Sequence, residues 1–398
     1  MASGRPIGIL CVTSYEKGQE FLRACKGLGC TVYLLTVEKL RNANWPREVI
    51  DEMFFMPEEL PIHELLAAVS YAARTRHIDR IVALDEFDME NVAAIREHLR
   101  LPGIGQTAIR FFRDKLAMRT QAKEAGLLVP EFVHVLNYED VQEFMARVPG
   151  PWLLKPRSQA SGIGMKKISA AQELWPWLDQ LGDQQSNFLL EQFVTGSMYH
   201  VDGIVADRKV LFAEAHAYGA PPLDVSHYGG VFTTRTMVRD AAVTIELKKV
   251  NQKVVEGLNL VRGVFHGEFL KAAADGRIYF IEIAARVGGA YISDVVRAAT
   301  GIDLWREWAK LEVENEYRLP ATRADYAGVI LSLARQQEPD TSSYSDPEIV
   351  ERISKYHHAG FLVKSASEKR VEELLMSYTE RFKEDFLARE PVPDRPTS

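Results

Sequence analysis

The sequence predicts a multidomain protein of the α/β and α+β classes that begins with a doubly wound parallel sheet. Three observations support this prediction. The chain has 398 residues, which at about 100–200 residues per domain indicates two or three domains. Strand and helix patterns alternate through the first hundred residues or so. Beyond residue 110 that alternation gives way to short strands and glycine-bearing turns.

The N-terminal segment alternates apolar runs with amphipathic helical patterns. Strands are expected at residues 7–12, 31–35, 53–56 and 81–84, and helices at 21–28, 65–72 and 91–99. Strand–helix alternation at this spacing is typical of βαβ units, which build a parallel sheet with helices on both faces. The glycine fingerprint of dinucleotide-binding sheets does not follow the first strand. A dinucleotide is therefore not the expected ligand.

Three acidic residues follow the fourth expected strand: Asp85, Glu86 and Asp88. The carboxyl end of a strand is where open α/β sheets bind their ligands. Acidic residues are also common at the start of a helix, where they face its positive end. We favour capping of the helix at 91–99 and keep a ligand role as the alternative.

Composition excludes several classes of partner and points to a soluble, cytoplasmic protein. The net charge is −7 and the isoelectric point is about 5.9, which argues against nucleic acid as the main partner. No apolar run approaches the roughly 20 residues that span a bilayer, so no membrane partner is expected. The three cysteines, Cys11, Cys25 and Cys30, are too few and odd in number for a disulfide framework.

Two lysines flank a polar turn that suits a phosphate. Lys155 lies on the apolar strand 152–156, where an amino group needs an anionic partner, and Lys115 opens a helix at 114–126, where a cation is unfavourable unless an anion is near. The turn 157–164 offers hydroxyls and unhindered N–H groups. Its candidate ligands are Ser158, Ser161, Gly162 and Gly164. A plain hairpin loop is the alternative for the turn alone, but both lysines together indicate a polyphosphate.

A hairpin around Gly276 carries two glutamates, Glu268 and Glu282, on otherwise apolar strands. A two-residue turn would place them on opposite faces. A three-residue loop at 274–276, with Gly276 left-handed, pairs Ala273 with Arg277 and sets the glutamates opposite each other. Such a pair repels, so without metal one carboxylate is expected to have a raised pKa. Mg²⁺, which prefers carboxylate and phosphate oxygens, would remove the conflict.

Arg286 has the same strand parity as Glu282 and should point to the same face. Gly288 and Gly289 then lead into a helix expected to begin near Ala290. Glycines at a helix start expose N–H groups to an anion. With Arg286 beside them, they predict a phosphate or carboxylate site.

Together these features resemble the ATP-grasp family over residues 105–310, preceded by that family's usual N-terminal α/β domain. The resemblance rests on Arg113-Asp114-Lys115, Ala125-Gly126, Val129-Pro130, Leu154-Lys155-Pro156, Glu191-Gln192-Phe193-Val194, and the pair Glu268 and Glu282 followed by Arg286. It implies the following organisation: 1–110, N-terminal domain; 111–190, subdomain A; 191–320, subdomain B with the metal site; 321–390, a small C-terminal α/β segment; 391–398, a tail.

The resemblance also implies roles for individual residues. Lys115 and Lys155 would contact the phosphates of ATP under a lid loop at 158–164. Glu191, with the backbone of Phe193 and Val194, would hold the adenine edge. Glu268 and Glu282 would hold Mg²⁺, with Mn²⁺ as the alternative metal.

Two positions depart from the family pattern. Met198 stands where a ribose-binding Glu is common, which leaves His200 or Asp202 as the expected ribose contact. Ala284 replaces an Asn that commonly helps to hold metal, so the number of metal ions stays open and more of the charge falls to Arg286.

The implied function is an ATP- and Mg²⁺-dependent carboxylate–amine ligase that works through an acyl phosphate and releases ADP and phosphate. Arg286 and Lys155 are the candidate catalytic residues. The stretch at 282–289 most resembles the L-amino-acid ligases, so small-molecule carboxylates and amines are the expected partners, with residues 218–222 and 226–230 as candidate pocket segments. A biotin carboxylase-like enzyme and a non-catalytic nucleotide sensor are the alternatives. A homodimer is open as the oligomeric state.

Overall fold

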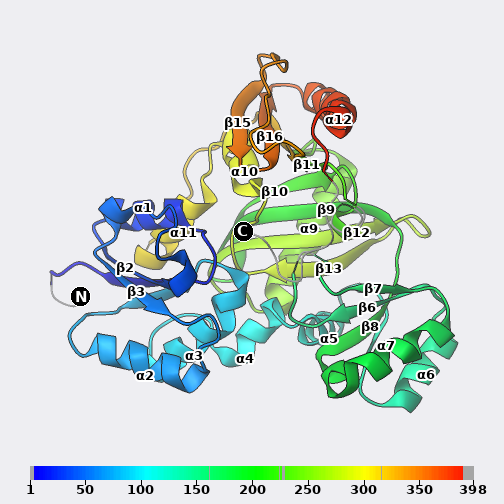
Figure 1. Cartoon of the computed structure of the whole chain (residues 1–398), viewed down its shortest axis with the longest axis horizontal. Helices are drawn as coiled ribbons and strands as arrows, with labels where there is room; N and C mark the ends of the chain where they lie inside the picture. The colour runs from blue at the N-terminus through cyan, green and yellow to red at the C-terminus, as the bar shows by residue number, and fades with distance from the viewer. Residues whose placement is uncertain (1–3, 161, 224, 226–228, 315, 389–398) are drawn as a thin grey trace.

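The computed structural model describes residues 4–160, 162–223, 225, 229–314 and 316–388, and these residues form three sheets (Figure 1). Ser161 and residues 226–228 of the expected site lie outside the described residues. Within the described part, no helix combines the length and the apolar character needed to cross a bilayer.

The first sheet is the expected parallel one. Its strands are β1 (Gly8–Thr13), β2 (Thr31–Val37), β3 (Glu52–Met56) and β4 (Arg80–Ala83), in the order β3-β2-β1-β4. Alternate residues of β1 belong to two separate cores, Ile9 and Cys11 on one side and Leu10 and Val12 on the other. Such a sheet must be covered on both faces, which confirms the doubly wound prediction.

The helices that cover this sheet come from two distant parts of the chain. They are α1 (Gln19–Gly27), α2 (Ile62–Ala73), α3 (Met89–Leu99) and α11 (Leu304–Val313). Residues of α2 and α3 share a core with Leu10. Trp308 of α11 packs on Phe21 of α1, with ring centroids 5.0 Å apart. One face of the N-terminal sheet is therefore covered by α1 together with a helix from far along the chain, which lies beside α1 in Figure 1.

The second sheet has four antiparallel strands in the order β5-β8-β6-β7. These strands are β5 (Phe132–His134), β6 (Trp152–Pro156), β7 (Lys166–Ile168) and β8 (Phe188–Gln192). Helices α6 (Tyr138–Arg147) and α7 (Leu174–Leu181) share its core. Before it come α4 (Gln106–Ile109) and α5 (Lys115–Glu124), and Asp114 accepts hydrogen bonds at the start of α5. The expected helix at 114–126 is thus present.

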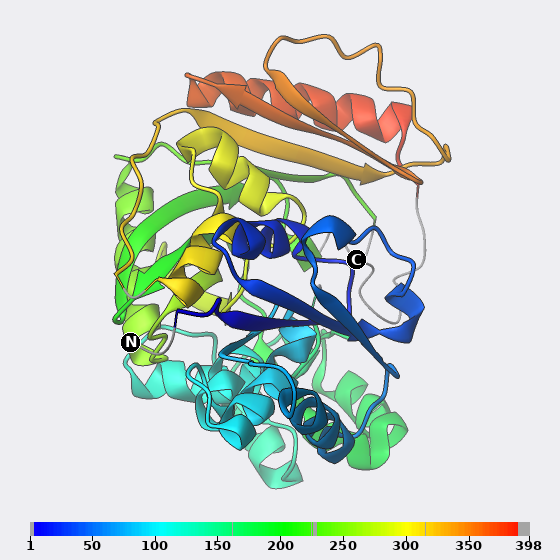
Figure 2. The same ribbon diagram turned by 90° about the vertical axis from the view of Figure 1, so that its left-hand side faces the viewer.

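The third sheet has eight strands in the order β13-β12-β9-β10-β11-β14-β16-β15. They are β9 (Gly196–Ala206), β10 (Lys209–Tyr218), β11 (Phe232–Thr236), β12 (Gly263–Ala272), β13 (Ile278–Ala284), β14 (Tyr326–Leu333), β15 (Ile349–Lys355) and β16 (His358–Ser365). The strands of the C-terminal segment therefore extend the same sheet that carries Glu268 and Glu282. Figure 2 shows α12 (Glu368–Asp385) lying along them at the top of the view.

The remaining helices connect these layers. They are α9 (Ala242–Gly257), α10 (Ile292–Thr300) and the 3-10 turns Glu38–Leu40, Arg47–Val49, Glu86–Asp88, Arg110–Phe112, Ala171–Glu173 and Gly182–Asn187. The helix expected near Ala290 begins two residues later, because Ala290 and Tyr291 have left-handed backbones, with φ of 50° and 60°.

The hairpin of β12 and β13 reaches the expected register by a different route. Glu268 does pair with Glu282, and Gly276 is left-handed with φ of 68°. The prediction of a three-residue loop is wrong, because Ala272 instead donates its N–H to the carbonyl of Arg277 and leaves a four-residue loop. A bulge at residue 281 then shifts the register by one residue. The bulge restores the alignment of the two glutamates that the longer loop alone would have lost.

We expect Gly276→Ala to destabilise the protein, because an L-residue in the left-handed region costs about 1–2 kcal/mol. Gly27→Ala is the matched control. Both glycines have open space where a Cβ would stand, but only Gly276 has a positive φ. Since Gly27 ends helix α1, its replacement should be neutral or stabilising by about 0.5 kcal/mol. Urea unfolding measures both, and equal effects would contradict the backbone explanation.

Candidate active site

Lys155 lies in a buried ion-pair network. Its amino group contacts one carboxylate oxygen of Glu191, and the guanidinium of Arg119 donates to the other at 2.6 Å. All three side chains are buried. Burial opposes the charge on Glu191, but the two cations outweigh it and hold its pKa below the usual value. Burial also lowers the pKa of Lys155, against the pull of Glu191. The anionic partner that the sequence required for Lys155 is thus a carboxylate of the protein.

Lys115 joins three parts of the site. Its amino group donates to the carbonyl of Gln159 at 2.6 Å and to Glu282 at 3.0 Å. The side chain is buried at the first turn of α5. A lysine opposes the positive end of a helix, and Glu282 supplies the compensating anion. This contact holds the polar turn 157–164 close to the hairpin glutamate.

The polar turn connects β6 and β7, as expected. Gly162 and Gly164 both have left-handed backbones, with φ of 73° and 72°. A Cβ at Gly164 would lie 2.9 Å from Pro156, so the turn folds back on the end of β6. Ser158 is exposed, and its carbonyl accepts a hydrogen bond from Arg113 at 2.6 Å. The Ser158 hydroxyl therefore lies at the surface.

Glu268 has protein partners of its own. The Tyr218 hydroxyl donates to its carboxylate at 2.8 Å, and Nε2 of His266 lies 3.7 Å from the same oxygen. Burial would raise the pKa of Glu268, but His266 and Tyr218 outweigh burial and lower it. Glu268 is therefore not a carboxylate with the raised pKa that the sequence predicts for one member of the pair. The glutamates face each other, yet each is compensated on its outer side, Glu282 by Lys115 and Glu268 by Tyr218 and His266.

Arg286 links the hairpin to the N-terminal domain. It donates to Glu86 at 2.7 Å, and both side chains are largely buried. Burial opposes the charge on Glu86, but Arg286 with Arg113 lowers its pKa to about 2. The favoured capping of the helix at 91–99 is wrong, because Asp88 stands at the start of α3 without a side-chain cap hydrogen bond. Asp85 caps only the 3-10 turn before α3, where it accepts the N–H of Phe87. Asp88 instead binds the hydroxyl of Ser14 at 2.6 Å.

His200 and Asp202 do not lie where a ribose could reach them. Both are fully buried, with 0% exposure. Nδ1 of His200 lies 2.5 Å from Asp202, and its Nε2 lies 2.7 Å from the hydroxyl of Thr234. The structure therefore contradicts their expected role as ribose contacts. They belong to a buried polar cluster with His216 and His266.

The segment expected at the adenine edge follows β8. Phe193 is half-buried and already donates its N–H to the carbonyl of Pro151 at 3.0 Å. Val194 and Met198 are also half-buried. The amino group of Lys167 lies 4.2 Å from the centre of the Phe193 ring. An adenine would thus meet a half-buried apolar segment whose Phe193 N–H is engaged.

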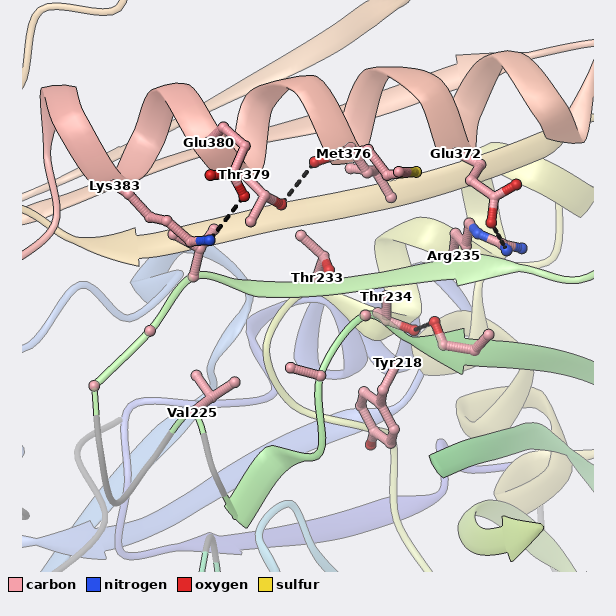
Figure 3. A pocket seen from close by; sticks show the side chains of 17 residues that line it. Tyr218, Val225, Thr233, Thr234, Arg235, Glu372, Met376, Thr379, Glu380 and Lys383 are labelled. Carbon is pink, nitrogen blue, oxygen red and sulfur yellow. Dashed lines mark hydrogen bonds and ion pairs between the residues drawn. The ribbon is translucent and has the colours of Figure 1, made fainter. Parts of the chain in front are cut away.

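A cavity of about 740 Å³ opens beside Tyr218. Figure 3 shows Thr233, Thr234 and Arg235 of β11 on one side of this cavity and Met376 and Thr379 of α12 on the other. Arg235 is paired there with Glu372. Tyr218 links the cavity to Glu268, because it lines the cavity and its hydroxyl donates to that carboxylate.

Sequence reasoning missed several residues of this site, among them Arg119, Glu86 as the partner of Arg286, Tyr218 as a ligand of Glu268, and His216. Arg119 lies in the middle of an amphipathic helix and looks like a surface residue in the sequence. Its position three residues before the buried Ala122 is the one signal that it shares the inward face of α5.

The sequence profile of the ATP-grasp domain matches residues 120–291. Residues 120–291 therefore carry the ATP-grasp domain that the sequence resembles, and the mixed architecture predicted from the sequence is confirmed.

Two curated relatives come from Bacillus subtilis. The L-arginine-specific L-amino acid ligase is 24% identical over 248 residues, which cover 61% of this chain and 59% of the relative. The alanine–anticapsin ligase is 23% identical over 284 residues, which cover 65% and 57%. The chain thus spans less than two thirds of the length of either relative.

Solved structures extend the likeness in fold to nearly the whole chain. An L-amino acid ligase from Bacillus licheniformis superposes with a TM-score of 0.78 at 16% identity, over 98% of this chain and 100% of the other. The N5-carboxyaminoimidazole ribonucleotide synthetase from Thermus thermophilus gives 0.72 at 18%, over 96% and 99%. A biotin carboxylase from Campylobacter jejuni gives 0.69 at 15%, over 95% and 91%.

The Glu86–Arg286 pair predicts a pH-dependent contribution to stability. The pKa of Glu86 is about 2 in the folded protein, below its ordinary value near 4.3. The ion pair therefore stabilises the folded protein at pH values above this ordinary pKa. This stabilisation is lost as the pH falls toward 2. Glu86→Gln should cost about 3 kcal/mol at pH 7 and progressively less below pH 4.

Urea unfolding of wild type and Glu86→Gln from pH 7 to pH 3 measures this loss. The control is Glu90→Gln, an exposed acid one turn further along α3, whose stability should follow that of wild type throughout. A constant difference between Glu86→Gln and wild type across this range would contradict the assignment.

Proposed function

We propose that this protein is an ATP-dependent carboxylate–amine ligase that joins amino acids or similar small molecules. One observation carries the proposal: Glu268 and Glu282 face each other on one side of the sheet, with the buried amino group of Lys115 on Glu282. The buried Lys155 is close enough to Lys115 for the charge of Lys115 to lower its pKa. The L-amino acid ligases among the relatives support the substrate class. The cytoplasm, which holds ATP and free amino acids, is the compartment we assign.

The buried cations near the glutamate pair are suited to a polyphosphate. Lys115, Lys155 and Arg119 are all buried, as is Arg113. Their carboxylate partners are Glu191, Glu282 and Glu86. Buried cations that are already held in place lose little conformational entropy when a phosphate arrives. We therefore assign Lys155 and Lys115 to the phosphates, with the turn that carries Ser158, Gly162 and Gly164 above them.

The residues present fit a magnesium ion. Glu268 and Glu282 offer carboxylate oxygens from neighbouring strands, the ligand type that Mg²⁺ prefers together with phosphate. When bound, the ion neutralises charge on the phosphates. Lys115 at 3.0 Å from Glu282 and Tyr218 at 2.8 Å from Glu268 would keep the two carboxylates oriented.

The reaction assigned to this site has two transfers. A substrate carboxylate oxygen attacks the γ-phosphorus of ATP, and ADP leaves. An amine then attacks the acyl carbon, and phosphate leaves with the bonding electrons. Both partners of the first step are anions, so the lysines and Arg286 must offset their repulsion. Arg286, held by Glu86 at 2.7 Å, is assigned to the incoming carboxylate.

The cavity between β11 and α12 is our candidate for the substrate side. It adjoins Glu268 through Tyr218, and its lining combines Leu375 and Met376 with charged groups of α12. A cavity of about 740 Å³ falls in the range of small-molecule sites. Residues 218–222, which the sequence singled out, contribute Tyr218, Gly219 and Ala220 to it.

We expect ATP to be converted to ADP and phosphate only when a carboxylate and an amine are both present. Pools of amino acids, with phosphate release as the measurement, test this expectation. Hydroxylamine in place of the amine should yield a hydroxamate, which reports the acyl phosphate. AMP and pyrophosphate as products would contradict the mechanism. Turnover that needs bicarbonate and biotin would establish the carboxylase alternative, and ATP binding without any turnover would favour a sensor.

We expect Lys155→Met to weaken ATP binding at least tenfold, because a charge-assisted hydrogen bond contributes about 1.5–3 kcal/mol. It should also lower the free energy of unfolding, because Glu191 keeps only Arg119. Calorimetry of nucleotide binding and urea unfolding measure the two effects. Lys166→Met, on the exposed neighbouring strand β7, is the control, and an unchanged ATP affinity in Lys155→Met would remove Lys155 from the phosphate site.

A further inference from the structure

A second cluster of potential metal ligands lies beside the hairpin glutamates, on the neighbouring strands of the eight-stranded sheet. His200 and Asp202 are two residues apart on β9 and therefore share a face. His266 of β12 pairs directly with Asp202, and His216 of β10 pairs directly with His200. Three strands thus bring three imidazoles around one carboxylate.

The imidazoles converge on the two oxygens of Asp202. Nδ1 of His200 lies 2.5 Å from one oxygen, and Nδ1 of His266 lies 2.9 Å from the other. One ligand atom from each of these three side chains lies within 4.8 Å of the others. Donors around a tetrahedral zinc, at about 2.0–2.1 Å from the metal, are about 3.3 Å apart. The observed separations require only small side-chain rotations to reach that spacing.

His216 gives an independent indication of a missing ligand. Its ring is fully buried and stacks on His200 with centroids 4.6 Å apart. Neither ring nitrogen has a hydrogen-bond partner among the described residues, and Nδ1 stops 3.6 Å from Asp202. A buried imidazole without partners is costly. A group that accepts its lone pair would remove this cost.

The outer nitrogens of two rings are held as they are in metal-binding histidines. Nε2 of His200 faces the Thr234 hydroxyl at 2.7 Å, and Nε2 of His266 faces Glu268 at 3.7 Å. A metal-bound imidazole usually gives its second N–H to a hydroxyl, carbonyl or carboxylate, which fixes its orientation.

We propose that His200, Asp202 and His266 form a buried site for a divalent transition metal of the zinc class, with His216 as the fourth ligand. Nitrogen donors select such metals, whereas Mg²⁺ requires oxygen donors. The site is therefore chemically distinct from the pair Glu268 and Glu282. Glu214 of β10 lies next to the site but is not one of the ligands, because it forms an ion pair with Arg239 at 2.8 Å.

The metal would fasten the sheet under the glycine loop that follows β13. It would join β9, β10 and β12 through side chains. A Cβ at Gly288 would lie 2.9 Å from an oxygen of Asp202, so this loop packs directly on the cluster. The role we assign is structural: the metal fixes the platform on which Arg286 and Gly288 stand.

Cobalt titration of the full chain after chelation and dialysis tests the site, because four-coordinate Co²⁺ has strong visible bands and octahedral Co²⁺ does not. We expect these bands at one equivalent, their loss on addition of Zn²⁺ and their persistence in excess Mg²⁺. Zn²⁺ should also raise the melting temperature, with no comparable rise from an equal concentration of Mg²⁺. Absence of the bands, with no stabilisation by Zn²⁺, would show that the cluster is only hydrogen-bonded.

Substitutions at a proposed ligand, at its hydrogen-bond partner and at control residues show where the metal binds. His200→Gln should abolish the bands, and Thr234→Val, which keeps the ring but removes its hydroxyl partner, should weaken cobalt binding about 10–100-fold. Thr234→Val retains the side-chain shape and serves if His200→Gln does not fold. Two controls should keep the bands: His63→Gln at an exposed histidine, and Glu282→Gln in the proposed magnesium pair. Bands that survive His200→Gln and Thr234→Val, or that vanish in Glu282→Gln, would overturn the proposal. None of these measurements requires ATP turnover.

Discussion

Strand register is the constraint on which both candidate sites depend. Side chains alternate along a strand, so a shift of one residue would move a whole set to the other face of the sheet. The register places Glu282, Glu268, His200 and His216 in one row across β13, β12, β9 and β10. The row begins with carboxylates suited to magnesium and ends with imidazoles suited to a softer metal. The bulge at residue 281 is essential to it, because the turn of the hairpin alone would leave Glu282 out of the row.

The buried charges around Lys115 and Lys155 are balanced within the protein. Lys155 and Arg119 share Glu191, Lys115 holds Glu282, and Arg286 holds Glu86. Burying any of these cations alone would be costly, so the carboxylates allow the cations to be buried close together. Under the proposed function, a polyphosphate would exchange one set of anions for another, and the cations would start held in place by their present partners.

How well the sequence predicts a structural feature depends on how far apart in the chain the residues that determine it lie. Local patterns predict the parallel sheet, the helix after Asp114 and the position of Lys155 on a buried strand, because each follows from periodicity or capping within a few residues. The sequence also predicts the facing glutamates, although it does not reveal the four-residue loop and the bulge that jointly produce them. It misplaces His200 and Asp202, because exposure depends on the loop of Gly288, which packs over them from 86 residues away. The partnership of Arg286 with Glu86 spans 200 residues and leaves no local signal.

That long contact explains how the N-terminal domain can take part in chemistry centred elsewhere. Arg286 follows the strand that carries Glu282, yet its carboxylate partner Glu86 lies just beyond the carboxyl end of β4, where open sheets bind ligands. Under the proposed function, a substrate carboxylate bound by Arg286 would have to share the guanidinium with Glu86 or displace it. That displacement would leave Glu86 free to attract a cationic group, such as a substrate ammonium. An amino acid substrate would carry both groups, so the Arg286–Glu86 ion pair would offer a partner to each of its charged ends.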